Sequence, residues 1–182
     1  GIVCPKNISN DEREKFEATL FLEINSNQTG AKSTLKQAIG LVLTPFTPDS
    51  IATRVLSEID VSTGPLSRMF ERYDFEKDKI KTSSIISYAL RPLVKPSGAD
   101  SLFAIWDHPN KSGMVSSQDH SALNDYVAFC VREINTLLSA TKSVLPYERW
   151  TTEKKVEGRF LTTLNINSVL ILLRRLIENS QV

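Results

Sequence analysis

The sequence has few of the residues from which metal centres and disulfide frameworks are built. Its only cysteines are Cys4 and Cys130, its only histidines are His108 and His120, and no Cys-x-x-Cys pair occurs. Structural zinc sites need clustered thiolate or imidazole ligands, so we expect no metal centre in this chain. Cys130 falls on an apolar stripe at helical spacing, which predicts a buried and reduced thiol.

Long apolar runs and a secretory signal are also missing. No stretch approaches the roughly 18 consecutive apolar residues of a membrane-spanning helix, and the first residues lack the pattern of a signal peptide. We therefore expect neither a membrane span nor secretion, and we predict a cytoplasmic protein. The net charge of +1 argues against a chain that wraps nucleic acid through bulk positive charge, and equally against an acidic shell.

Recognisable catalytic motifs are absent from a composition that is otherwise ordinary. The hydrophobic content of 41% with 24% charged residues is typical of globular proteins, and 182 residues suffice for a core without disulfides. No GxSxG, Walker A, HExxH or paired-carboxylate pattern occurs. The stretch Gly30-Ala31-Lys32-Ser33 is like the end of a P-loop, but the earlier glycine and the preceding strand are missing. We therefore reject a P-loop.

Apolar residues recur at helical spacing through most of the chain, which predicts a mainly α-helical fold. The first helix is expected over residues 11–25. Ser9 and Glu12 have the spacing of a capping box, in which each side chain accepts a hydrogen bond from the other residue's backbone N–H. Phe16 and Leu20 begin an apolar stripe, continued by Ile24 and widened by Phe21, that we expect to face a core.

The remaining elements are predicted from apolar periodicity, caps and breakers. Helices are expected over residues 33–43; from Pro48 with Thr47 as its N-cap; over 66–73; from Thr82 or Ser83 to a kink or stop around Pro92; for one or two turns at 102–106; over 117–141; and from Asn165 or Asn167 onward. Residues 74–81 are expected to form an exposed connection or short hairpin with solvated charges. Residues 107–117 are expected to form a loop in which His108 is exposed and unpaired.

The helix predicted over residues 117–141 has an apolar stripe with 4-3-4-3 spacing. The stripe consists of Leu123, Val127, Cys130, Ile134 and Leu137. Such spacing is typical of a helix that lies along its neighbours or against a second copy of the chain. A homodimer through this helix is therefore one structural hypothesis.

A polar elbow at residues 23–30 separates the first two predicted helices. It gathers carboxylate, amide and hydroxyl groups between two apolar faces. Three interpretations are open. The side chains close backbone hydrogen bonds at a helical corner, or they bind a phosphate or a nucleotide-held metal beside a helix N-terminus, or they contact a partner.

Aromatic and basic side chains alternate in the segment that precedes the last helix. Tyr147 and Trp150 lie among four cations, and such mixtures can stack bases and hold phosphates. The alternative is a loop folded on the core with a solvated rim. The cations that would contact DNA are Arg149, Lys154, Lys155 and Arg159.

The chain begins Gly-Ile-Val-Cys-Pro, without an initiator methionine, and we interpret it as part of a longer protein. Ile2 and Val3 would then be the last strand of a sheet. This interpretation divides the chain into residues 1–43, the end of an α/β domain, and residues 44–182, a helical domain.

Three stretches carry a resemblance to a known family. FLEINSNQTGAKSTLKQ at residues 21–37, IKTSSIISYALRPLV at residues 80–94 and NINSVLILLRRLIEN at residues 165–179 resemble the DGQHR-motif family. That family includes DndB-like proteins linked to bacterial DNA phosphorothioation and genome defence, and it is distantly similar to the ParB and sulfiredoxin fold. The Asp-Gly-Gln-His-Arg motif itself does not occur in this sequence. The resemblance places it upstream of Gly1.

The resemblance implies a role for the polar elbow. In ParB-like relatives a similar Glu-Asn turn faces the nucleotide phosphates and their metal, which makes Glu23, Asn25, Asn27 and Gln28 candidates for half of a nucleotide site. A half site supplies neither positioning nor charge stabilisation for phosphoryl transfer, so we expect no hydrolase activity and no cofactor in this chain by itself. A nucleotide with Mg²⁺ would belong to the longer protein.

Three hypotheses for the function follow. The chain is a binding or regulatory module of a bacterial DNA-modification or defence protein, and contacts DNA or partner proteins of that system. Alternatively, it is one half of a nucleotide-hydrolysing enzyme with a ParB-like fold. The third alternative is a structural dimerisation domain that uses the helix at residues 117–141.

Overall fold

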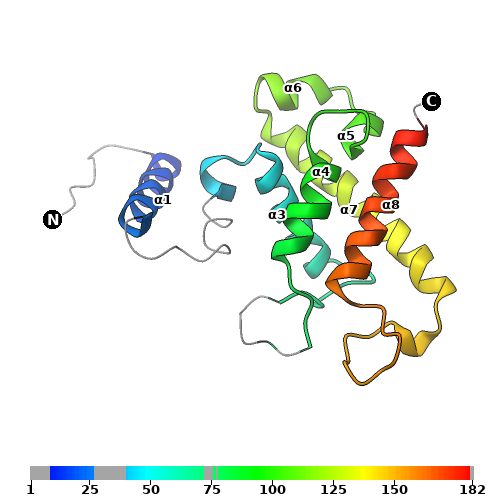
Figure 1. Cartoon of the computed structure of the whole chain (residues 1–182). Helices are drawn as coiled ribbons and strands as arrows, with labels where there is room; N and C mark the ends of the chain where they lie inside the picture. Colours follow the sequence, from blue (N-terminus) through cyan, green and yellow to red (C-terminus); the bar gives the residue numbers. More distant parts are fainter. Residues whose placement is uncertain (1–8, 27–39, 72–75, 77, 181–182) are drawn as a thin grey trace. The chain divides into compact units, whose positions relative to one another are not determined.

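The computed structural model describes residues 9–26, 40–71, 76 and 78–180, and it divides the chain into two units, Gly1–Pro45 and Phe46–Val182. The predicted mainly α-helical fold is confirmed (Figure 1). The described residues contain no β-strand, only an isolated bridge between Phe70 and Ile80. The strand expected at Ile2 and Val3 lies outside the described residues. The origin of the first segment as part of an α/β domain stays a prediction.

The described part of the first unit contains helix α1, Asn10–Ser26. The predicted capping box is confirmed: Ser9 N–H donates to Glu12 Oε2 at 2.9 Å, and Glu12 N–H donates to Ser9 Oγ at 3.3 Å. These hydrogen bonds hold the pKa of Glu12 below its ordinary value. The predicted core face is weaker than expected, because Phe16 and Leu20 are half-buried and Phe21 is 43% exposed. Phe21 lies about 100° around the helix from Leu20.

Of the helix predicted over residues 33–43, only residues 40–43 are described, and they are helical. The second unit then opens with α3, Pro48–Val61, where the predicted cap is confirmed. Thr47 Oγ1 accepts a hydrogen bond from Ser50 N–H at 3.3 Å, and Pro48 occupies the first turn, where its missing N–H has no consequence. The predicted core positions on α3 are buried; they are Ile51, Val55, Leu56 and Ile59.

The helix predicted over residues 66–73 is wrong for its described part. Residues 62–68 form bends and turns, and Arg68 has a φ of 58°, which no residue of a right-handed helix adopts. Asp60 at the end of α3 holds this turn: its carbonyl accepts from Arg68 N–H at 2.9 Å, and its Oδ1 accepts from Phe70 N–H at 3.4 Å. Leu66 and Phe70 are buried without forming a helix.

The connection that leads to the next helix is fixed at Ile80 by burial and by two backbone hydrogen bonds. Ile80 is 2% exposed, its N–H donates to Met69 O at 2.9 Å, and its carbonyl accepts from Glu71 N–H at 3.0 Å. The bridge between Phe70 and Ile80 is parallel, so these two residues are not paired in the predicted hairpin.

The next helix passes through Pro92 instead of stopping there. A π-helical segment, η1 (Ile85–Leu90), runs directly into α4 (Arg91–Val94), and the Arg91 N–H donates to Ile86 O, five residues back. Pro92 has no N–H for a normal helical bond and its ring crowds the carbonyl four residues earlier, so a widened turn before it removes both problems. The helix begins directly after Thr82, whose carbonyl accepts from Ile86 N–H at 2.9 Å.

Two short helices connect α4 to the longest helix. α5 is Leu102–Ile105, as predicted, and α6 is Lys111–Ser116, where a loop was expected. α7 is His120–Val144, and Asp119 caps it by accepting from Ser121 N–H at 2.8 Å. The expectation for His108 is wrong: its side chain is 23% exposed and its Nε2 lies 3.4 Å from Asp125 Oδ2.

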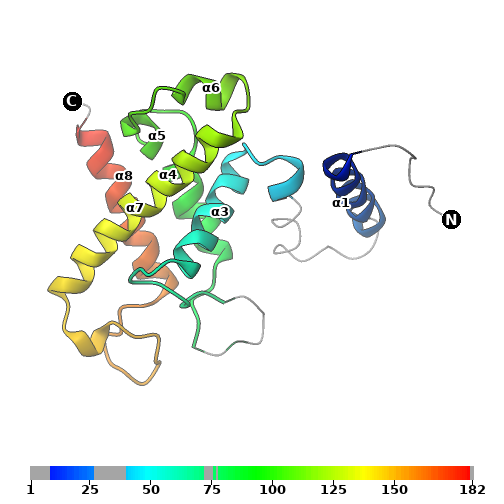
Figure 2. The ribbon, with the colours of Figure 1, turned by 180° about the vertical axis from the view of Figure 1, so that it is seen from behind.

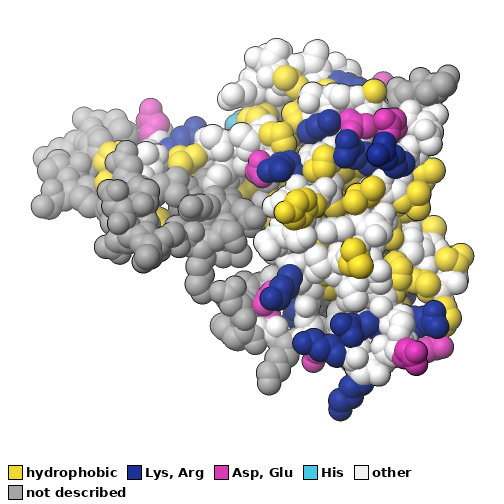
Figure 3. All heavy atoms as spheres, in the orientation of Figure 1, with side chains coloured by type: hydrophobic (Ala, Val, Ile, Leu, Met, Phe, Trp, Pro, Cys, Tyr) yellow, Lys and Arg dark blue, Asp and Glu magenta, His cyan; other side chains and the backbone are white. Residues whose placement is uncertain are grey.

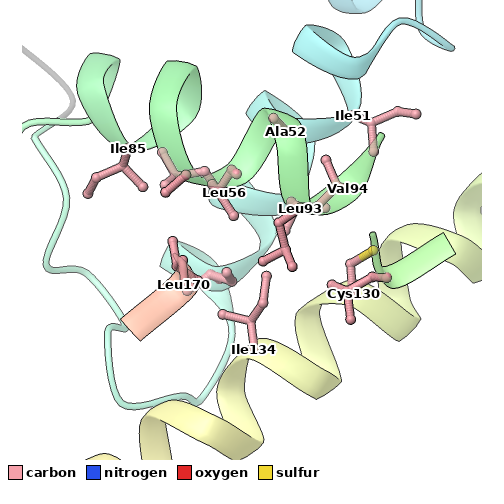
Figure 4. Close-up of a cluster of buried hydrophobic side chains, with 14 of the residues drawn as sticks. Ile51, Ala52, Leu56, Ile85, Leu93, Val94, Cys130, Ile134 and Leu170 are labelled. Atoms are coloured by element: carbon pink, nitrogen blue, oxygen red, sulfur yellow. The ribbon is translucent and has the colours of Figure 1, made fainter. Parts of the chain in front are cut away.

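α7 runs the length of the second unit (Figure 2), and its buried side chains form part of the core. It packs against α3, α6 and α8, and four members of its predicted stripe are buried, while Leu137 is partly buried. Figure 4 shows Cys130 and Ile134 of α7 facing Leu93 and Val94 of α4. The buried thiol at Cys130 is confirmed. Because the stripe packs inside the unit, a homodimer through α7 would have to use another face of the helix.

The chain ends with η2, Tyr147–Arg149, a loop, and α8, Thr163–Ser180. The cap of α8 is Thr162, whose Oγ1 accepts from Asn165 N–H at 3.2 Å, so the caps predicted at Asn165 and Asn167 are wrong. Both asparagines lie inside the helix: Asn165 Nδ2 donates to Phe160 O at 2.9 Å, and Asn167 Nδ2 donates to Ser84 Oγ at 3.3 Å. Within the described residues, no helix is long and apolar enough to span a bilayer.

Candidate functional site

The four residues predicted for a nucleotide site lie at the edge of the described chain. Glu23 and Asn25 belong to the last turns of α1, which continues to Ser26, so the helix extends further into the predicted elbow than expected. Their side chains, and Asn27 and Gln28 entirely, lie outside what the structure describes. A nucleotide site at this elbow stays a prediction.

A cleft of about 670 Å³ lies in the second unit where two connecting segments meet. One wall is the segment before the π-helix and the other is the segment that leads into α8. The described residues that line it are Glu71, Glu76, Asp78, Lys79, Ile80, Lys81, Thr152, Lys154, Arg159, Leu161, Thr162 and Thr163. A smaller hollow of about 450 Å³ shares Glu76 and Lys79 with it.

Backbone hydrogen bonds fix the wall that precedes α8. Phe160 N–H donates to Arg149 O at 2.7 Å, and Leu161 N–H donates to Thr151 O at 3.2 Å, which closes residues 149–161 into a loop. Gly158 allows the reversal with a φ of 67°. A side chain there would meet the Arg149 guanidinium carbon at 3.2 Å, so Arg149 packs over the glycine.

Two of the four predicted DNA-contacting residues line the cleft. Lys154 is exposed, whereas Arg159 is half-buried and its Nη1 donates to Lys154 O at 3.2 Å. Arg149 and Lys155 are exposed on the same loop but outside the cleft. None of the four forms an ion pair with a carboxylate of the described residues. Within the described part of the chain, no ion pair therefore neutralises their charges.

Two further cations face them from the other wall, and the sequence analysis missed both. Lys79 and Lys81 flank the buried Ile80, and in extended backbone the neighbours of a buried side chain point the opposite way. Lys79 Nζ also donates to Arg68 O. The signal in the sequence is a single apolar residue, Ile80, between two lysines, in a segment whose alternating charges predict a solvated connection.

The cleft is not uniformly basic. Glu71, Glu76 and Asp78 line the first wall, whereas the wall that leads into α8 contributes cations and threonine hydroxyls. That second wall ends at the N-terminus of α8, where the helix dipole is positive. An anion would therefore be held by Lys154, Arg159 and the start of α8, with Lys79 and Lys81 opposite. The described residues hold no group of His, Cys, Asp and Glu arranged to bind a metal ion.

The aromatic residues of this segment divide into two roles. Trp150 stacks on Phe160, with ring centroids 5.3 Å apart, and its Nε1–H donates to Pro65 O at 3.1 Å. Trp150 is thus used for packing, as in the interpretation of a loop folded on the core. Tyr147 is 89% exposed and stays available to a ligand.

Comparisons of the chain with models of protein families, with curated proteins and with solved structures found no match. The resemblance to the DGQHR-motif family is therefore supported by the sequence stretches alone and stays a prediction.

Proposed function

We propose that the second unit is a binding module of a bacterial DNA-modification or defence protein, and that it contacts the DNA backbone through the basic side of the cleft. The observation that supports this proposal is the convergence around one cleft of Lys154 and Arg159 with Lys79 and Lys81, which come from a segment more than seventy residues earlier. The exposed Arg149 and Lys155 extend the same basic surface along the loop.

Such a surface binds the phosphates of the DNA backbone and does not distinguish base sequences. Lysine and arginine neutralise phosphates and release counterions, so binding weakens steeply with salt. Four neutralised phosphates correspond to a slope of about −3 to −4 in a plot of log K against log salt concentration. The three carboxylates on the opposite wall oppose the approach of phosphates there, so we expect weak binding that is measurable at low salt.

The test is fluorescence anisotropy of a labelled DNA duplex, titrated with the protein at several salt concentrations. The variant Lys154→Glu with Arg159→Glu should abolish retention at low salt. A matched control, Arg91→Glu with Arg132→Glu, changes the net charge equally at exposed positions on α4 and α7 and should keep most of the affinity.

Two outcomes would contradict the proposal. Wild-type protein that shows no retention at low salt would remove DNA contact through this unit. Equal loss in the two double variants would mean that net charge, and not the cleft, governs the binding. Reversal of Arg149 and Lys155 in addition to Lys154 and Arg159 tests whether the loop outside the cleft contributes.

A further inference from the structure

The cleft that carries the proposed DNA contact has acidic side chains on one of its two walls. Glu71, Glu76 and Asp78 line the wall that precedes η1, together with Lys79 and Lys81. Figure 3 shows basic side chains gathered at the lower end of the second unit, with acidic side chains beside them. A ligand that fills the cleft meets carboxylates on one side only. The polar residues that line the other wall carry no negative charge; they are Thr152, Lys154, Arg159, Thr162 and Thr163.

Backbone geometry directs the carboxylate of Glu71 into the cleft. Phe70 is 4% exposed and Ile80 is 2% exposed, and the bridge between them is parallel. Because side chains alternate in extended backbone, Glu71 on one segment and Lys79 and Lys81 on the other point away from this buried pair. The Glu71 N–H donates to Ile80 O at 3.0 Å, which fixes the backbone that carries the carboxylate beside the two lysines.

The acidic and basic groups of the cleft do not neutralise one another. Within the described residues, neither Glu71 nor Asp78 forms an ion pair with a cation, and Lys81 and Lys154 have no carboxylate partner there. The Thr163 hydroxyl donates to Lys81 O at 3.5 Å and so connects the two walls. The volume of about 670 Å³ lies in the range of small-ligand sites and suffices for one nucleotide.

We infer that the cleft binds an unpaired nucleotide of a DNA strand, and that it favours a base that carries an amino group. This inference rests on the proposed function and names the class of DNA that the cleft takes. The phosphate lies against Lys154, Arg159 and the start of α8. The base lies on the other side, where Glu71 and Asp78 accept hydrogen bonds from its amino group. In a duplex the bases are stacked and paired, so carboxylates inside a cleft reach a base only in an unpaired strand.

The carboxylates provide the base preference that the basic side of the cleft lacks. Cytosine and adenine present an amino group as a donor, and carboxylates accept from such a group. Thymine has no amino group and presents carbonyl oxygens on both sides of its ring N–H, so a carboxylate is repelled. Because Asp78 is exposed, we expect the lower end of the discrimination that such contacts give, about a fivefold difference in affinity.

Fluorescence anisotropy at low salt and slightly alkaline pH tests the preference, with labelled oligodeoxycytidine, oligothymidine and a duplex of equal length. Wild-type protein should bind oligodeoxycytidine about fivefold more tightly than oligothymidine, and also more tightly than the duplex in spite of its higher charge density.

The variant Glu71→Gln with Asp78→Asn should remove the difference between the two oligonucleotides without weakening the binding of oligothymidine. Amides donate to thymine carbonyls as well as accept from amino groups, and two negative charges are lost from the cleft. Asparagine tolerates the φ of 56° at position 78, so the backbone is kept. The matched control is Glu153→Gln with Glu157→Gln, which removes the same charge at exposed positions outside the cleft and should keep the fivefold difference.

The outcomes separate this inference from the proposed function. Equal affinity of the wild type for the two oligonucleotides, tighter binding of the duplex, or a preference that survives Glu71→Gln with Asp78→Asn overturns the inference and leaves the backbone contact standing. Absence of binding to all three DNAs overturns the proposed function itself.

Competition with free deoxycytidine monophosphate distinguishes a nucleotide within a strand from a free one. We expect the monophosphate to displace oligodeoxycytidine poorly, because it lacks the flanking phosphates that the exposed cations of the loop contact. Displacement at an equal concentration of nucleotide would assign the cleft to a free nucleotide and overturn the inference.

Discussion

The imidazole of His108 stacks on the indole of Trp106, with ring centroids 4.7 Å apart and ring planes 5° apart. His108 Nδ1 accepts from Asn110 N–H at 3.2 Å, so the neutral ring carries its proton on Nε2, which faces Asp125 of α7. Trp106 is 4% exposed and also contacts Tyr126 and Phe103. The histidine therefore packs the loop before α6 onto the aromatic cluster of Phe103, Trp106 and Tyr126.

We expect His108→Ala to lower the free energy of unfolding by about 1 kcal/mol, because it removes the stack and the loop hydrogen bond. Urea unfolding followed by tryptophan fluorescence measures the change. His108→Phe keeps an aromatic ring on Trp106 but loses both ring nitrogens, so it should recover the part of the stability that comes from stacking. If His108→Ala unfolds at the wild-type urea midpoint, the stack contributes nothing.

The turn after α3 should depend on one carboxylate. Asp60 is 5% exposed and its Oδ1 accepts from the Phe70 N–H, so Asp60→Ala leaves this N–H without its acceptor and should cost about 2 kcal/mol. Asp60→Asn keeps an acceptor at that place and should cost less. Urea unfolding of the three proteins measures the difference. Equal losses in the two variants would show that the charge of Asp60, and not its acceptor geometry, holds the turn.

Local features of the fold could be predicted from sequence because their interactions lie within one helical turn. The capping box of Ser9 and Glu12 and the cap formed by Thr47 involve residues three positions apart. The turn at Arg68 could not be predicted in this way. Its conformation depends on Asp60, eight residues earlier, and the apolar spacing of Leu66, Met69 and Phe70 is equally compatible with a helix.

The π-helix could not be predicted from its apolar spacing. The buried residues of this helix form two columns with a spacing of four: Ile85, Ala89 and Leu93, and Ile86, Leu90 and Val94. An α-helix places residues four apart on the same face, as it does for Phe16 and Leu20 in α1, so this spacing is equally compatible with an ordinary α-helix. Only Pro92 marks the place where the helix widens.

Only the part of the candidate cleft that is formed by one continuous loop could be predicted from sequence. Lys154 and Arg159 are close in sequence and share a loop, so their proximity followed from the segment itself. Lys79 and Lys81 join them only because Ile80 pairs with Phe70 and is buried. Pairing between distant segments is a tertiary property, and charge alternation in the sequence did not reveal it.

Asp100 should make stability depend on pH at the acidic end. Hydrogen bonding to Lys95 Nζ, at 3.0 Å, and to Arg174 Nε, at 2.6 Å, holds the pKa of its carboxyl below the ordinary value of 3.8, although burial opposes this. A folded-state pKa below the unfolded one stabilises the protein at pH values above the unfolded pKa, and the contribution is lost as pH falls through the folded pKa. Asp100→Asn should thus lose about 1 kcal/mol at neutral pH and approach the wild type below about pH 4.

The control for Asp100 is Glu178→Gln, which removes the exposed pair with Arg175 and changes the charge equally. Screened pairs of this kind contribute little, so we expect less than about 0.5 kcal/mol at any pH. Urea unfolding at several pH values between neutral and strongly acidic measures both variants. A wild-type advantage over Asp100→Asn that persists unchanged at the lowest pH would contradict the assignment.

Cys130 should report on the opening of the core. Its thiol is 0% exposed, and burial raises its pKa above the ordinary value, so the reactive thiolate is suppressed in the folded protein. In a Cys4→Ser background, a thiol reagent should therefore modify Cys130 only during unfolding. Combined with Asp60→Ala, which is expected to cost about 2 kcal/mol, the modification rate should rise about 30-fold, since 1.4 kcal/mol is a factor of ten. Rapid modification in the folded state, insensitive to Asp60→Ala, would mean that α7 opens locally without the rest of the core.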